Sequence, residues 1–158
     1  MCSIDHCDGK TSFHHRQRAS RFVAPGPTEA ETWARMVGRG FSEGQECTPE
    51  FLNILIPSFQ IPHAIPFLAW VDGKLAPVAG GFIIPERKMV ALSGDASSPE
   101  FRRRGLQTAL QQARLKLAAE AGCDLAVTVT LGGTTSQRNA ERLGFRLAYS
   151  KATMTKMC

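Results

Sequence analysis

The sequence feature that most constrains this chain is the stretch SSPEFRRRGLQTAL, at Ser97–Leu110. It follows a strand-like segment, and its three consecutive arginines and Gly105 lead directly into apolar residues at helical spacing. The N-terminus of a helix carries unpaired amides and a partial positive charge, so it attracts anions even without basic side chains. Arg102, Arg103 and Arg104 add forked donors that match phosphate oxygens, and Gly105 lets the backbone come close. The stretch therefore predicts a pyrophosphate site at the start of a helix.

Two interpretations of this arginine turn compete. A run of like charges is more often a solvated surface turn than a binding site. Here the strand, Pro99, the arginines, Gly105 and an amphipathic helix occur together, which favours anion binding. The Lys-Ser/Thr of a Walker loop is absent, and GRGFSEG at 38–44 has the wrong glycine spacing for a dinucleotide fingerprint and follows a helix. The sequence thus disfavours nucleotide hydrolysis and hydride transfer.

Hydrophobic periodicity predicts one mixed α/β domain over residues 21–158, preceded by a loose polar arm at residues 1–20. Asp72-Gly73 predicts a tight hairpin, and Gly94 predicts a bulge or a close backbone approach. The helix after the arginine turn is expected to cross over between parallel strands of a single mixed sheet flanked by helices. Strands are expected at 21–25, 67–71, 75–84, 89–97, 124–130 and 145–155, and helices at 28–41, 48–57, 106–121 and 136–143.

Several elements also carry a predicted buried face. Thr28 and Glu31 stand in capping-box spacing at the start of the first helix. We expect the strand at 124–130 to be buried, and Leu147 and Tyr149 to pack from one face of the last strand. The buried residues expected in the two longer helices are Ala30, Trp33, Ala34, Val37 and Phe41 in the first, and Leu106, Ala109, Leu110, Ala113 and Leu117 in the second.

Composition bounds the remaining possibilities. The chain has 158 residues, 43% of them hydrophobic, and a net charge of +5, which suits one domain with an anionic partner. No apolar run approaches the roughly 20 residues of a membrane span, and MCSIDHCDGK lacks the apolar stretch of a signal peptide, so we expect a cytoplasmic protein without a membrane partner. Five scattered cysteines predict reduced thiols. The residues Cys2, His6, Cys7, His14 and His15 match no closed zinc spacing, and no metal is predicted.

These residues resemble the GNAT superfamily of N-acetyltransferases. SSPEFRRRGLQTAL is similar to the family's strand, Gln/Arg-x-x-Gly-x-Gly/Ala turn and helix, with Arg102 and Gly105 at the first two signature positions. RNAERLGFRLAY is similar to the family's second cofactor segment, which ends in Leu-Gly-Phe. The resemblance extends from about Arg21 to the C-terminus. It implies the GNAT-type acyl-CoA N-acyltransferase fold, acetyl-CoA or another acyl-CoA as donor, and an amine as acceptor.

The resemblance also implies the residues that hold the donor. In such proteins the strand that here ends at Asp95-Ala96-Ser97 separates from the next strand at a bulge, and its amides hold the pantetheine arm and the thioester. The following turn wraps the pyrophosphate, and Asn139 corresponds to an asparagine near the pantetheine. The implied cofactor-binding residues are Asp95, Ala96, Ser97, Arg102, Arg103, Arg104, Gly105, Leu106, Gln107, Thr108, Ser136, Asn139 and Arg142.

Two positions depart from the family pattern. Gln107 stands where the signature has glycine or alanine, so its side chain must turn away from the phosphates or bond to them. Ala140 stands where the family often has a tyrosine that protonates the departing thiolate. The sequence therefore leaves the general acid open, with water as one proton source.

The expected chemistry is direct attack of a neutral amine on the thioester in a ternary complex, with a backbone amide of residues 95–97 stabilising the oxyanion. Asp95 is the first candidate for the base, with local backbone bonding as its alternative, and Glu46 and Glu43 are weaker candidates. Cys123 is expected in the core and not as a nucleophile. Phe41 is the aromatic residue best placed to line an acceptor pocket.

Three classes of function remain to be separated. The first is an N-acetyltransferase acting on a small-molecule or peptide amine, and the second is a non-catalytic acyl-CoA-binding module of the same fold, which Ala140 makes plausible. The third, a nucleic-acid binder, lacks the basic surface interleaved with aromatics that single strands require, so no nucleic-acid partner is predicted. A homodimer is common in proteins of this resemblance.

Overall fold

The computed structural model describes residues 21–23, 29–42, 45–58, 60–154 and 156. The predicted arm at residues 1–20 lies outside the described residues, as does Thr28, the expected helix cap. Among the described residues the first helix begins at Ala30, directly after its N-cap residue Glu29. The capping box at Thr28 therefore stays a prediction.

The described elements follow the predicted order up to the last strand. The strands are β1 (Arg21–Val23), β2 (Phe67–Val71), β3 (Lys74–Ile84), β4 (Met89–Ser97) and β5 (Leu125–Thr128). The α-helices are α1 (Ala30–Phe41), α2 (Pro49–Ser58), α3 (Leu106–Glu120) and α4 (Thr135–Arg142), and short 3₁₀ helices occupy Pro85–Arg87 and Pro99–Phe101.

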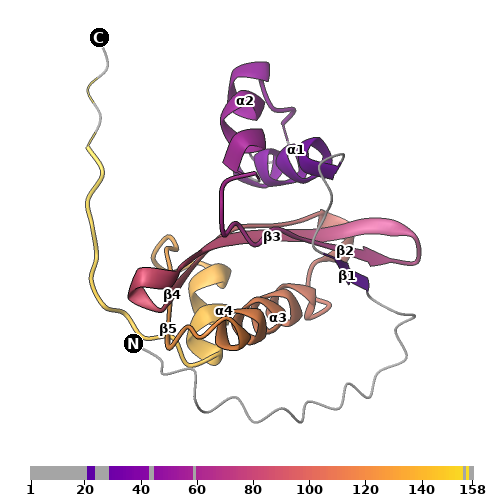
Figure 1. Ribbon diagram of the computed structural model, residues 1–158. Coiled ribbons are helices and arrows are strands. Elements are labelled where there is room, and N and C mark those ends of the chain that lie inside the picture. The colour runs from indigo at the N-terminus through magenta and orange to yellow at the C-terminus, as the bar shows by residue number, and fades with distance from the viewer. Residues whose placement is uncertain (1–20, 24–28, 43–44, 59, 155, 157–158) are drawn as a thin grey trace.

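In the described residues the strands form one sheet in the order β1-β2-β3-β4-β5. The first four strands pair antiparallel, whereas β5 pairs with β4 in parallel after the α3 crossover. Helices α1 and α2 cover one face of this sheet, and α3 and α4 cover the other (Figure 1). The predicted mixed sheet flanked by helices is confirmed.

The hairpin between β2 and β3 forms where the sequence predicts it. Asp72 and Gly73 have φ values of 52° and 74°. Two successive positive φ angles give the type I′ turn, whose twist matches that of the flanking strands. This hairpin fixes the register of the central strand β3.

The buried face of α1 matches the prediction at four of its five positions. Ala30, Trp33, Ala34 and Val37 are buried against the sheet. Phe41, at the last residue of the helix, is 69% exposed. The apolar face of α1 is therefore exposed to solvent at the C-terminal end of the helix, and Phe41 is not part of the core.

The buried face of α3 differs from the predicted one. Leu106 and Leu110 are buried as expected, but Leu117 is exposed. The side chains that complete the buried face are Gln111, Arg114, Leu115 and Ala118. Apolar periodicity missed this face because it treats an arginine as exposed, whereas Arg114 finds polar partners in the sheet.

The predicted last strand is not formed. Residues 145–154 have no strand assignment, and Figure 1 shows them leaving α4 and running away from the sheet. A strand needs a neighbouring edge for its backbone hydrogen bonds, and this segment does not lie along one. Leu147 and Tyr149 are consequently exposed, so their predicted packing is wrong. The β5 prediction was also too long, and Val129, beyond its end, is exposed.

Candidate active site

The candidate site lies at a bulge in β4, where its pairing with β3 changes register. Val78 of β3 faces Ala96 of β4, but two residues later Gly80 faces Ser93. Strand β4 therefore has one extra residue between these pairs, and Gly94 has a φ of 68°, which a residue with a side chain rarely adopts. The bulge predicted from Gly94 is confirmed.

The strands β4 and β5 separate next to this bulge. Their pairing ends at Leu92 and Thr128, so the segment Ser93–Ser97 has no partner in β5. A strand edge left without a partner presents backbone N–H and C=O groups that a ligand can pair with. The splayed geometry implied by the family resemblance is therefore present.

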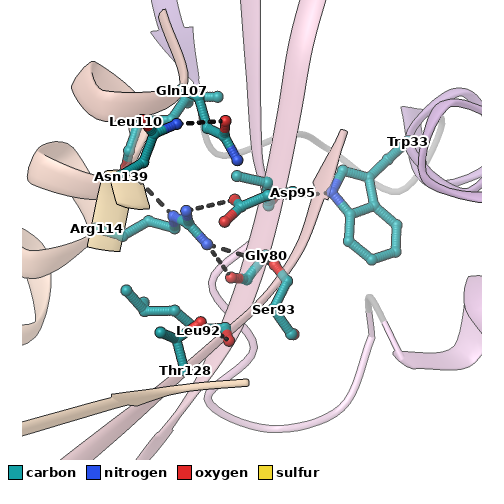
Figure 2. Close-up of polar contacts among 11 residues, drawn as sticks. Trp33, Gly80, Leu92, Ser93, Asp95, Gln107, Leu110, Arg114, Thr128 and Asn139 are labelled. Carbon is teal, nitrogen blue, oxygen red and sulfur yellow. Dashed lines mark hydrogen bonds and ion pairs between the residues drawn. The ribbon is translucent and has the colours of Figure 1, made fainter. Parts of the chain in front are cut away.

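Arg114 crosses from α3 to the bulge and is fully buried. Its Nη2 donates to Oδ1 of Asp95 at 2.5 Å, and its Nη1 donates to the carbonyl oxygens of Gly80 at 2.5 Å and Ser93 at 3.4 Å (Figure 2). One guanidinium thus ties together both strands at the bulge. Sequence reasoning missed Arg114, and the only signal for it was a charged residue close to the apolar face of α3.

The carboxylate of Asp95 is committed to this pair. Burial raises the pKa of Asp95 above its ordinary value, and the Arg114 charge and hydrogen bond offset part of the rise. Figure 2 shows the carboxylate pointing toward α3, whereas Trp33 lies on the other side of the strand. Asp95, the first candidate for the general base from the sequence, therefore points toward Arg114.

The arginine turn leads directly into the N-terminus of α3, which begins at Leu106. Arg103 and Gly105 both have positive φ, at 61° and 73°, and no side chain caps the helix. The first helical hydrogen bond runs from the amide of Ala109 to the carbonyl of Gly105, at 3.0 Å. The preceding amides of the helix are therefore free to bind an anion.

The three arginines surround this helix end and are exposed. Arg102 donates weakly to the carbonyl of Ser97 at 3.4 Å, and the guanidinium of Arg104 lies 5.4 Å from the ring centre of Phe101. Neither contact involves a carboxylate, so the positive charge of the turn is not neutralised within it. A pyrophosphate fits this cationic helix end.

The second cofactor segment lies beside the first. The side-chain amide of Asn139 in α4 donates to Oε1 of Gln107 in α3 at 3.0 Å, and Arg142 donates to Oδ1 of Asn139 at 3.1 Å. Ser136 precedes Asn139 by one turn of the same helix. The side chain of Gln107 thus bonds to α4, which explains how the signature position tolerates it. That these residues bind the cofactor stays a prediction.

The other acid–base candidates do not meet at the bulge. Glu46 is exposed and paired with Arg39, and this hydrogen bond lowers the pKa of Glu46. Glu43 lies outside the described residues. Ala140 is buried in α4, and Tyr149 is exposed on the segment that leaves the sheet.

A cavity of about 260 Å³ lies on the opposite face of the bulge from Arg114, under α1 and α2. Trp33 forms part of its wall and is held by a hydrogen bond from Nε1 to the carbonyl of Ala79, at 2.9 Å. A Cβ added at Gly80 would lie 2.8 Å from the Trp33 ring, so this strand can approach the indole only as glycine. The residues that line the cavity are Trp33, Val37, Phe41, Leu55, Ser58, Ala64, Pro66, Gly80, Gly81, Phe82, Ser93 and Gly94.

Cys123 lies in the core, as the sequence predicts. Cys123 is buried, and burial raises its thiol pKa, which disfavours the reactive thiolate. Among the described residues no group of three His, Cys, Asp or Glu side chains is placed to hold a metal ion. The His- and Cys-rich stretch near the N-terminus lies outside them. No helix in the described part of the chain is long and apolar enough to span a membrane.

Comparison with solved structures supports the fold. The chain is similar to the aminoglycoside N-acetyltransferase AAC(6')-Iy in complex with CoA-S-monomethyl-acetylneamine, with 22% identity, a TM-score of 0.71, and coverage of 89% of this chain and 100% of that one. It is similar to AAC(6')-Ih from Acinetobacter baumannii, with 18% identity, a TM-score of 0.69, and coverage of 89% and 99%. It is also similar to a putative acetyltransferase from Agrobacterium tumefaciens str. C58, with 17% identity, a TM-score of 0.70, and coverage of 86% and 99%.

At such identities these structures establish the fold alone. No curated protein matches the chain in sequence. The model of the Acetyltransferase (GNAT) family matches residues 30–145, a span that runs from the start of α1 past the end of α4 and includes the arginine turn, the bulge and the second cofactor segment. This chain belongs to the GNAT family of acetyltransferases.

Proposed function

We propose that the chain is an N-acetyltransferase that transfers the acetyl group of acetyl-CoA to a primary amine of a small molecule or peptide. The observation that carries this proposal is the uncapped, arginine-surrounded start of α3 beside the unpaired backbone of β4. The first feature suits a diphosphate, and the second suits an extended amide-containing arm such as pantetheine. AAC(6')-Iy, a structural neighbour, is described in complex with CoA.

In this proposal each part of the site has one task. The amides of Leu106, Gln107 and Thr108 bind the pyrophosphate together with the turn Arg102–Gly105. The backbone of Asp95–Ser97 holds the pantetheine arm and donates to the thioester oxygen as negative charge develops on it. Ser136, Asn139 and Arg142 complete the donor site from α4.

The reaction is a direct aminolysis of the thioester. The acceptor ammonium first loses a proton to water, and the nitrogen lone pair then forms the C–N bond to the acetyl carbon. The C–S bond breaks, and its electrons remain on the CoA sulfur. The second proton released from nitrogen passes through water to that sulfur, which gives the amide and free CoA.

Both candidate carboxylates among the described residues form ion pairs with arginines, and each pair must break before the carboxylate can act as a base. Asp95 is paired with Arg114, and Glu46 is paired with Arg39. Asp95 remains the first candidate by position, because it stands on the strand beside the expected thioester. Its alternative role is to hold the bulge in shape through Arg114. An Asp95→Asn variant separates the two: a base predicts a flattened pH profile of kcat/KM, whereas a positioning residue predicts a lower kcat with the profile unchanged.

A second candidate function is a non-catalytic acyl-CoA-binding module. Ala140, buried at the position where the family often has a tyrosine, and the paired carboxylates favour it. Both functions predict that CoA raises the thermal unfolding temperature. Only the enzyme predicts release of free thiol from acetyl-CoA that depends on an added amine.

The experiment that tests the proposal therefore has two measurements on the full chain. Binding of CoA is measured by calorimetry, and thiol release from acetyl-CoA is measured across a panel of primary amines. Binding without amine-dependent thiol release supports the binding module and contradicts the enzyme. Absence of CoA binding contradicts both functions.

We also propose that the protein acts in the cytoplasm, where acetyl-CoA is available, and that it forms a homodimer. The support for the dimer is the outer edge of β5, which has no strand partner in the described residues, and the exposed apolar side chains Val129, Leu131, Leu147 and Tyr149. A second copy that brings its residues 145–154 to this edge would cover both apolar sets. Light scattering tests this: a monomeric mass at micromolar concentration contradicts the dimer.

A further inference from the structure

We infer that the acceptor is a compact apolar amine, with an alkyl or arylalkyl body and a single amino group, and not a polycationic amine such as an aminoglycoside. This inference rests on the proposed function, because it assigns the cavity under α1 and α2 to the acceptor. The assignment follows from position. The cavity reaches Ser93 and Gly94, which directly precede the backbone expected to hold the thioester.

The first argument is the absence of charge in the cavity wall. None of the described residues that line it carries an ionisable side chain, and the only polar side chains among them are those of Ser58 and Ser93. Asp95, which follows Gly94, is paired with Arg114 on the other face of the strand, and Glu46, the first described acidic residue after Phe41, is paired with Arg39. The described part of the wall therefore offers no unpaired anion to an incoming cation.

The second argument is the free energy of desolvation. An amino group that stays charged in an apolar site without a partner loses its hydration, at a cost of several kcal/mol per ion. An aminoglycoside carries several ammonium groups and many hydroxyls, each of which needs a partner. A single amine pays this penalty once, and it avoids most of it by entering as the neutral base.

The third argument is shape. Trp33, Phe41 and Phe82 contribute three aromatic rings, and the indole is fixed by its bond to Ala79. A volume of about 260 Å³ exceeds the roughly 150 Å³ that suffices for benzene in an apolar protein cavity. It therefore admits one aryl ring or a short alkyl chain with its amine.

The apolar wall also favours deprotonation of the acceptor amine, a step that a general base would otherwise assist. A primary alkylamine resembles the lysine side chain, with a pKa near 10 in water. An apolar environment disfavours the charged form and lowers the pKa of an amine, by several units in full burial. The cavity thus raises the fraction of neutral, nucleophilic amine, which accounts for a site whose described carboxylates are held by arginines.

The test compares two classes of acceptor on the full chain with acetyl-CoA. Phenethylamine and hexylamine represent apolar monoamines, and neamine and spermidine represent polycations. We expect kcat/KM for the apolar monoamines to be at least about tenfold higher, since burial of the apolar body favours binding and the polycations lack partners. Phenethylamine, but not neamine, should also raise the unfolding temperature in the presence of CoA.

A matched pair of variants tests the location. Phe41 and Ile54 are 69% and 68% exposed, so a charge at either is compatible with folding, but only Phe41 lines the cavity. Phe41→Glu should lower kcat/KM for phenethylamine at least tenfold while the Kd for CoA stays unchanged. Ile54→Glu, on the outside of α2, should leave both quantities unchanged.

The outcomes separate this inference from the proposed function. Transfer that is faster to neamine than to phenethylamine overturns the acceptor class and leaves the acetyltransferase intact. Equal losses in Phe41→Glu and Ile54→Glu overturn the location of the acceptor. Binding of CoA with no transfer to any of the four amines overturns the acceptor class, and the wider amine panel then decides whether the enzyme itself survives.

Discussion

The guanidinium of Arg114 and the carboxylate of Asp95 form a buried ion pair, with 2.5 Å between Nη2 and Oδ1. The same guanidinium donates to the carbonyls of Gly80 and Ser93, on the two strands that flank the bulge (Figure 2). The geometry of the bulge therefore depends on one side chain from α3. Gly80 and Ser93 also line the cavity under α1 and α2, so Arg114 holds the strands that form part of its wall.

The first prediction concerns the stability of this pair. Arg114→Met should lower the free energy of unfolding by about 3–5 kcal/mol, because it leaves a buried carboxylate and two carbonyls without their donor. Asp95→Asn should cost less, because the amide oxygen still accepts from Arg114. Urea denaturation of both variants and of the double variant measures the coupling. The double variant should lose less than the sum of the two single losses, and simple additivity would show that the pair is not coupled.

The second prediction concerns pH. Burial raises the folded-state pKa of Asp95 above 3.8, its ordinary value, so between these two values the folded chain holds a proton that the unfolded chain releases. Stability contributed by this group is present below pH 3.8 and is lost as the pH rises through the raised pKa. We therefore subtract the unfolding free energy of the Asp95→Asn variant from that of the native chain. This difference should fall as the pH rises from 3.8 through the raised pKa of Asp95. Asp72→Asn, in the exposed hairpin, is the control, and a difference that rises with pH contradicts the prediction.

The third prediction concerns the donor site. Arg104→Glu should weaken CoA binding by tenfold to a hundredfold or more, because one charge-assisted hydrogen bond is worth about 1.5–3 kcal/mol and the new carboxylate repels phosphate. Calorimetric titration at two salt concentrations measures the change. Arg87→Glu removes the same charge from the exposed turn between β3 and β4, at the opposite end of β4 from the arginine turn, and should have little effect. Equal effects of the two variants would indicate a general charge effect and not a pyrophosphate site.

The fourth prediction concerns the wall of the cavity. Gly80→Ala places a Cβ 2.8 Å from the Trp33 ring and should destabilise the fold by about 1–3 kcal/mol through overpacking. It should also raise KM for the amine without changing the Kd for CoA. In a Trp33→Phe background the smaller ring leaves room, so the cost of Gly80→Ala should fall. Gly132→Ala, where an added Cβ meets no atom within 4 Å, is the control; equal costs of Gly80→Ala in both backgrounds contradict the proposed contact.

The hairpin, the bulge and the arginine turn were predictable because each depends on residues adjacent in sequence. Asp72-Gly73 tolerates the two positive φ angles of a tight turn, and Gly94 tolerates the positive φ of the bulge. The segment from Pro99 to Gly105 likewise encodes its own conformation. These local signals were sufficient to identify the family.

The role of Asp95 was not predictable in the same way. Its local sequence allowed a base or a residue bonded to nearby backbone, and the observed partner is an arginine on the following helix. The pattern of α3 concealed this, because a buried arginine is rare unless it is paired. The prediction of a strand at the C-terminus was wrong for a related reason. Alternation of apolar and polar residues indicates a strand, but the strand forms only where the edge of a sheet offers hydrogen-bond partners.

The sequence alone determined the order of the elements up to α4, the arginine turn before α3 and the family, because these depend on short-range backbone preferences and on hydrophobic periodicity. The tertiary structure decided that Arg114 pairs with Asp95, and that Trp33, Phe41 and Phe82 meet at one cavity whose described lining carries no charge. These relationships join residues on separate elements, and their free energies come from burial and ion pairing that no single segment contains.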